Sequence, residues 1–169
     1  MADMIGKITD SRGLLEKIAS KIPGFSGYME RETRREADKM VRDTIANRYG
    51  EQLSRISDLQ VQLVSSGGIE YVDDLQDAAT RLQRFVDMVK TAAYGYAGLF
   101  DAVKINEAEL TKIYQFDTSI LDNVSQVAAA VDNVAASMGD GLPAAIRHLS
   151  SLIAEANTNY ERRKEVITS

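Results

Sequence analysis

Residues 110–138, LTKIYQFDTSILDNVSQVAAAVDNVAASM, decide the fold class of this chain. Apolar side chains recur along this stretch at a seven-residue spacing, in two sets that are offset by three positions. The first set is Leu110, Val124, Val131 and Met138, and the second is Ile113, Ile120, Val127 and Val134. A repeat of this kind is typical of a helix buried along the continuous seam of a coiled coil. The stretch therefore predicts a long core helix in a helical bundle.

Other segments on both sides of this stretch also show helical periodicity. A short amphipathic helix is predicted over residues 11–22, where Pro23 ends it. Longer helices are predicted over residues 28–65 and 69–94, and a last one begins at Pro143, which suits a first helical turn. The glycine-containing turns between long segments are short, so the helices that they join are expected to run antiparallel.

We therefore expect an all-α protein: an antiparallel up-down-up-down four-helix bundle with a short N-terminal amphipathic helix. A chain of 169 residues fits a single domain, residues 1–169. Within it, residues 1–27 form the N-terminal helix and turn, and residues 28–169 form the four long helices. The helix over 28–65 would be about 55 Å long, against about 35–45 Å for the others. We expect its start to project beyond the bundle, or the helix to break near Gly50.

Composition favours a folded protein of the cytoplasm. The chain is 44% hydrophobic, contains two prolines and lacks cysteine, so it has neither disulfides nor thiolate metal sites. We see no secretion signal, and no window approaches the roughly 20 apolar residues of a membrane span. The 20 basic and 25 acidic residues give a net charge of −5, without a dense basic stripe, so nucleic acid is not an expected partner.

Patterns that would support catalysis or metal binding do not emerge from the sequence. A di-iron helical bundle needs paired Glu-x-x-His motifs, whereas this chain has one histidine, His148, with Ala145 in the glutamate position. Glycine-rich phosphate loops are also missing. We therefore expect a protein that is not an enzyme and that uses no cofactor and no metal. His148 is interpreted as a partly exposed structural residue.

Asp117 is the one polar interruption of the heptad seam. A carboxylate in this position must be solvated, paired or protonated, because burying it charged and alone costs several kcal/mol. We interpret Asp117 as a buried polar seam residue that fixes helix register or lies at a solvated end. A ligand-binding or proton-handling role is the alternative.

One end of the expected bundle gathers aromatic and arginine side chains. In an up-down-up-down arrangement, the start of the helix over 28–65, the loop over 94–105 and the C-terminus share an end. A partner-contact surface is predicted there, because interfaces depend on such side chains; the alternative is that the aromatic residues plug the core. The predicted contact residues are Phe25, Tyr28, Arg31, Arg34, Arg35, Tyr94, Tyr96, Leu99 and Phe100.

Two strings resemble segments of small uncharacterised bacterial all-helical proteins that have no named family. They are residues 22–39, IPGFSGYMERETRREADK, and residues 110–117, LTKIYQFD. The resemblance implies a bacterial, non-enzymatic helical protein and carries no site residues with it.

Together these features predict a non-enzymatic helical interaction or scaffold protein that self-associates or docks a protein partner. One alternative is a peripheral membrane-associated protein that uses its N-terminal amphipathic helix, although residues 1–27 carry little net positive charge and no tryptophan. Another is a helical bundle that senses a small apolar ligand.

Overall fold

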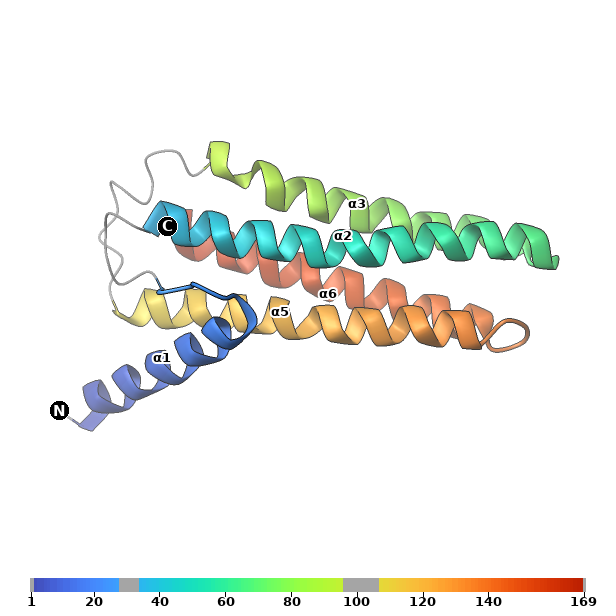
Figure 1. Cartoon of the computed structure of the whole chain (residues 1–169). Helices are drawn as coiled ribbons and strands as arrows, with labels where there is room; N and C mark the ends of the chain where they lie inside the picture. The colour runs from blue at the N-terminus through green and yellow to red at the C-terminus, as the bar shows by residue number, and fades with distance from the viewer. Residues whose placement is uncertain (1, 28–33, 96–106, 169) are drawn as a thin grey trace.

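The computed structural model describes residues 2–27, 34–95 and 107–168, and in these ranges the chain is helical with no strand. The prediction of an all-α protein is confirmed for this part of the chain. The helices are α1 (Ala2–Lys21), α2 (Arg34–Ser66), the 3₁₀ turn η1 (Ile69–Tyr71), α3 (Val72–Gly95), α5 (Glu107–Ala136) and α6 (Leu142–Thr168) (Figure 1).

The four long helices lie side by side around a common core. Helix α2 packs against α3 and α5, and α6 packs against the same two helices. Helix α1 lies outside this group and packs on α5 (Figure 1). Each long helix therefore has two long neighbours, and α5 has α1 as a third.

Helix α5 places its heptad seam in the core. Ile113, Ile120, Val127 and Val134 are fully buried, as predicted from their spacing. The prediction is wrong for Met138, which lies beyond the end of α5 and is 38% exposed. The chain leaves the helix there because Gly139 adopts a positive φ of 125°, which ends the regular repeat.

The helices differ from the predicted ones in several places. Helix α1 starts at Ala2 and continues through Gly13, so it is longer than the predicted helix. Helix α2 passes through Gly50 without a break, because burial of the adjacent Tyr49 outweighs the roughly 1 kcal/mol cost of one helical glycine. The start of the predicted 28–65 helix was expected to project; residues 28–33 lie outside the described residues, but from Arg34 on this start is packed into the bundle, with Arg34, Ala37 and Asp38 buried. The segment from Ile69 opens as a 3₁₀ turn before α3 begins.

Helix α1 is held on α5 by apolar and polar contacts together. Ile18, Ile22 and Phe25 are buried in the common core. The Ser11 and Thr111 hydroxyls hydrogen-bond, Lys21 pairs with Asp122, and Arg48 donates to the carbonyl oxygen of Lys21.

Two glycines shape the turn that follows α1. Gly24 and Gly27 have positive φ values of 85° and 90°. A Cβ atom on Gly24 would have open space, whereas one on Gly27 would lie 2.6 Å from the Tyr114 hydroxyl oxygen and 2.9 Å from a methyl group of Leu15. The chain at Gly27 thus passes too close to α1 and α5 for any side chain.

These two glycines form a matched pair for mutation. Gly24→Ala is expected to lower the free energy of unfolding by about 1–2 kcal/mol, from backbone strain alone. Gly27→Ala should cost more, because Tyr114 or Leu15 must also move, and amide hydrogen exchange in α1 should accelerate. Urea denaturation and hydrogen exchange measure both effects. Equal losses in the two variants would contradict a close approach at Gly27.

Candidate functional site

Asp117 lies in the core with no solvent exposure, facing an arginine from another helix. The Arg163 side chain of α6 is also fully buried, and its Nε donates to Asp117 Oδ1 at 2.5 Å. The same guanidinium donates through Nη2 to Asp38 Oδ1 of α2 at 2.6 Å. One arginine therefore joins two carboxylates that come from two different helices.

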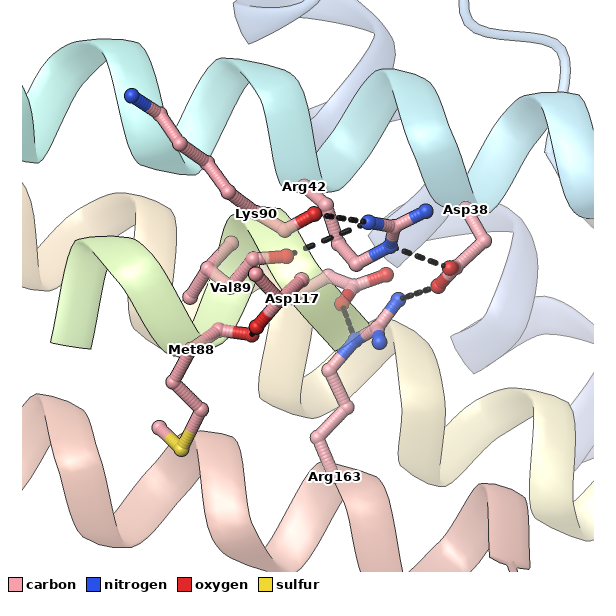
Figure 2. Close-up of polar contacts among 8 residues, drawn as sticks. Asp38, Arg42, Met88, Val89, Lys90, Asp117 and Arg163 are labelled. Carbon is pink, nitrogen blue, oxygen red and sulfur yellow. Dashed lines mark hydrogen bonds and ion pairs between the residues drawn. The ribbon is translucent and has the colours of Figure 1, made fainter. Parts of the chain in front are cut away.

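A second arginine extends this cluster to the remaining long helix. Arg42 donates from Nε to Asp38 Oδ2 at 2.7 Å. Its Nη1 lies 3.3 Å from the carbonyl oxygen of Val89 and 3.5 Å from that of Lys90, on α3 (Figure 2). Asp38, Arg42, Asp117 and Arg163, called the charge layer below, thus connect α2, α3, α5 and α6.

The charge layer is electrically balanced and suited to holding helices together. Two carboxylates, which accept hydrogen bonds, face two guanidinium groups, which only donate. Buried ion pairs of this kind often add little net stability over apolar packing, but removing one partner leaves a charge buried without compensation. The layer therefore holds α2, α3, α5 and α6 through side chains that each need a partner.

An aromatic group lies beside the charge layer. The Phe85 ring makes edge contacts with the rings of Tyr49 and Tyr160, at centroid distances of 4.8 Å and 6.0 Å. The Arg163 guanidinium lies 6.0 Å from the centroid of the Tyr160 ring. Tyr160 thus connects the buried rings to the charge layer.

Two polar side chains inside this region are used for structure. The Tyr49 hydroxyl donates to the carbonyl oxygen of Ile120 at 2.7 Å. Burial raises the pKa of Tyr49 above its ordinary value, so the hydroxyl stays a donor. Asn123 Nδ2 donates to the carbonyl oxygen of Leu152 at 3.1 Å. These bonds link α2 to α5 and α5 to α6 at defined positions along the helices.

The residues of the predicted contact surface fall in different environments. Phe25 and Arg34 are buried, at 6% and 8% exposure, whereas Arg35 is exposed. Tyr94 belongs to the last turn of α3, and its side chain is outside the described part of the structure. Tyr28, Arg31, Tyr96, Leu99 and Phe100 lie outside the described residues. Within the described ranges, Arg35 alone of this set is exposed.

Exposed apolar side chains gather at the opposite end of the molecule. This end, called the turn end below, is formed by residues 61–77 and 132–142, which include both short turns (Figure 1). Val61, Val64 and Ile69 are 67%, 57% and 68% exposed, and Met138 also lies here. They are four of the five exposed large hydrophobic side chains among the described residues.

A hollow opens between the two turns of the turn end. Its volume is about 370 Å³, and Tyr71, Met138, Glu70 and Asp140 are among the residues that line it. The negative charge of Glu70, followed by burial, raises the pKa of Tyr71, and Asp140 and Asp74 add to the effect. Acidic residues of η1, α3 and the 137–141 turn therefore all influence the Tyr71 hydroxyl.

The described residues contain neither a group of side chains arranged for a metal ion nor a helix suited to span a membrane. No group of three or more histidine, cysteine, aspartate or glutamate side chains in these ranges is arranged to hold a metal ion. His148 is exposed on α6. No described helix combines the length and apolar character that crossing a membrane requires.

The comparisons with known proteins gave no match. No protein-family model matches the sequence, and neither a curated protein nor a solved structure resembles it significantly. The charge layer and the turn end are therefore interpreted from their own geometry.

Sequence reasoning identified Asp117 but missed the partners that surround it. Asp38 and Arg42 lie four residues apart in a charge-rich segment; this spacing indicates a pair on one helix face but does not distinguish an exposed pair from a buried one. Arg163 follows Ala156 and Tyr160 at helical spacing on the buried face of α6, which is a signal for its burial. The exposure of Val61 and Val64 was detectable too, because both lie off the face formed by Leu59 and Leu63.

Proposed function

We propose that this chain is a non-enzymatic helical scaffold that docks a protein partner through its turn end. Val61 and Val64, three residues apart on one face of α2, carry the proposal together with the exposed Ile69 of the following turn, because neighbouring exposed apolar side chains are typical of interaction sites. Their position beside two short turns gives a partner access without any rearrangement of the core.

The proposal includes an up-down-up-down four-helix bundle as the rigid body behind this surface. The pairing of each long helix with two long neighbours supports that arrangement. A buried charge layer that joins all four helices also supports it, since such a layer disfavours shifted packings. A rigid body lowers the cost of binding, because little of the scaffold has to be ordered on association.

The membrane alternative requires α1 to leave α5. The apolar side chains that would enter a lipid interface pack on the core: Ile18 and Ile22 are buried, and Leu14 and Leu15 are half-buried. Exposing large apolar side chains costs about 1.5–3 kcal/mol each. Docking through the turn end needs no such step, and the observations therefore favour it.

Replacing the exposed valines tests the docking surface. Val61→Ser together with Val64→Ser should change the free energy of unfolding by less than about 1 kcal/mol, because both side chains are already largely in water. The same variant should lose self-association or partner capture by at least about tenfold. Sedimentation velocity and quantitative capture from the source cell measure this loss.

Variants at the other end provide the control and the competing result. Met40→Ser replaces the remaining exposed large hydrophobic side chain, which lies near the start of α2, and should leave association unchanged. Tyr96→Ser with Phe100→Ser tests the contact surface predicted from the sequence. Loss of association in that variant, with full association in the valine variant, would move the docking site away from the turn end.

A further inference from the structure

The turn end carries charge of one sign. Its two segments, residues 61–77 and 132–142, contain acidic residues and neither lysine nor arginine. Asp132 is paired with Arg55, which lies outside the turn end. In the described part of the chain the other acidic residues form no ion pair. These unpaired residues are Glu70, Asp73, Asp74, Asp77 and Asp140.

Helix stability alone explains only part of this charge. Asp73 and Asp74 lie in the first turn of α3, where negative charge is favourable. Asp77, however, lies four residues after Asp73 on the same helix, which is a repulsive spacing. The last turns of α2 and α5 also end here without a basic residue, although the helix dipole favours one in that position. Arg81, four residues after Asp77, offsets that repulsion, so the unmatched charge lies at the ends of α2 and α5, where a positively charged occupant would be favourable.

The hollow brings acidic residues together with Tyr71 and Met138, whereas Val61, Val64 and Ile69 lie outside its lining. Glu70 and Asp140 line it from the two turns, beside the ring of Tyr71 and the side chain of Met138. Carboxylates next to an aromatic ring suit a lysine or arginine side chain, which pairs with the acids and lies against the ring. Arg81 and Arg147 line a separate groove together with Asp74 and Asp77. Glu70 and Asp140 are therefore the acids most available to a partner.

We propose that the occupant of the turn end is a basic amphipathic helix of a partner protein. Its apolar face would cover Val61, Val64 and Ile69, and a lysine or arginine would enter the hollow between Glu70 and Asp140. This inference rests on the proposed docking function and adds the chemistry of the partner. A helix is the form of peptide that presents apolar and basic side chains on adjacent faces at fixed spacing.

Other occupants fit these features less well. Two copies of the chain that met turn end to turn end would bring like charges together, which costs association energy. A metal ion alone would leave the exposed valines and Ile69 uncovered. Nucleic acid would be repelled by the uniform negative charge.

Defined peptides can test the chemistry of the partner. The probe is a fluorescent helix of about five turns built from leucine and lysine, with the leucines on one face. One comparison peptide replaces lysine with glutamate, and another replaces leucine with serine. Fluorescence anisotropy with the full chain should show binding of the leucine–lysine helix and at least about tenfold weaker binding of both others. Its affinity should also fall as salt rises above about 0.1 M.

Charge-neutral variants locate the binding site. Glu70→Gln with Asp140→Asn should raise the Kd of the leucine–lysine helix by about tenfold. Glu161→Gln with Glu165→Gln removes the same charge from exposed positions near the end of α6, and should change the Kd by less than about twofold. Equal effects of the two pairs would overturn the inference, because binding would then reflect net charge alone.

The proposed function and this inference fail in different ways. If Val61→Ser with Val64→Ser abolishes association with the native partner, but Glu70→Gln with Asp140→Asn does not, the docking site stands and the basic partner is wrong. If the valine variant retains association, the docking site itself is wrong. If the charge variant instead breaks a homo-oligomer seen by sedimentation, the occupant is a second copy, which also overturns the inference.

Discussion

Arg163→Met is expected to lower the free energy of unfolding by about 3–5 kcal/mol, as is found when one partner of a buried ion pair is removed. The side chain has no solvent exposure, and its guanidinium bonds to carboxylates on two other helices, Asp117 at 2.5 Å and Asp38 at 2.6 Å. Methionine fills much of the volume but leaves both carboxylates without this donor. Urea denaturation followed by circular dichroism measures the loss.

The neighbouring residue supplies the control for Arg163. Arg162→Met removes the same charge from an exposed position of the same helix, and should change the free energy of unfolding by less than about 0.5 kcal/mol. Similar stability losses in both variants would show that Arg163 contributes only net charge. That result would remove the basis for a structural charge layer.

Replacing the whole charge layer with apolar residues separates stability from specificity. A chain with Asp38→Leu, Arg42→Met, Asp117→Leu and Arg163→Met removes all four charges of the layer together, so it should recover most of the stability that Arg163→Met loses. If this variant regains stability but sediments as several species, the layer selects one helix arrangement. A protein that stays as unstable as Arg163→Met would show that these ion pairs stabilise the fold directly.

The fold class was predictable because each helix carries its own periodicity. The seam of α5 follows from a repeat within one stretch. Its residues Ile113, Ile120, Val127 and Val134 are buried, as that repeat requires. The errors occur where backbone conformation decides. Helix α5 ends at Ala136 and the chain turns at Gly139, so Met138 does not extend the seam. Helix α2 continues through Gly50, although glycine is a weak helix former.

The candidate sites were less predictable because they depend on contacts between helices. Asp117 stood out as a charge in an apolar seam, but nothing within residues 110–138 indicated that its partner was Arg163. Asp38 and Arg42 lie in a segment so rich in charge that it resembled a solvated face. The turn end brings together Glu70 and Asp140, which are about 70 residues apart in the sequence. Their proximity follows only from how the helices pack.

Phe85→Ala is expected to cost about 3–5 kcal/mol of unfolding free energy, because it removes a fully buried ring and leaves a cavity. Two edge contacts, with Tyr49 and Tyr160, are lost as well, and such contacts contribute about 0.5–1.5 kcal/mol each beyond burial. Phe116→Ala is the matched control, since Phe116 is half-buried on α5 and should show a loss of about 1 kcal/mol. Equal losses at the two positions would contradict a central role for Phe85.

The effect of Phe85→Ala should also extend to the charge layer. Phe85 packs on Tyr160, and the Tyr160 ring lies 6.0 Å from the Arg163 guanidinium, so a shifted Tyr160 disturbs the position of that arginine. The double variant Phe85→Ala with Arg163→Met should therefore lose less stability than the sum of the single losses, by about 0.5–3 kcal/mol. Losses that add fully would show that the aromatic group and the charge layer stabilise the helices independently. A coupling in the expected range would mean that one continuous structure of rings and ion pairs sets the register of α2, α3, α5 and α6, and keeps the turn end in the shape that a partner meets.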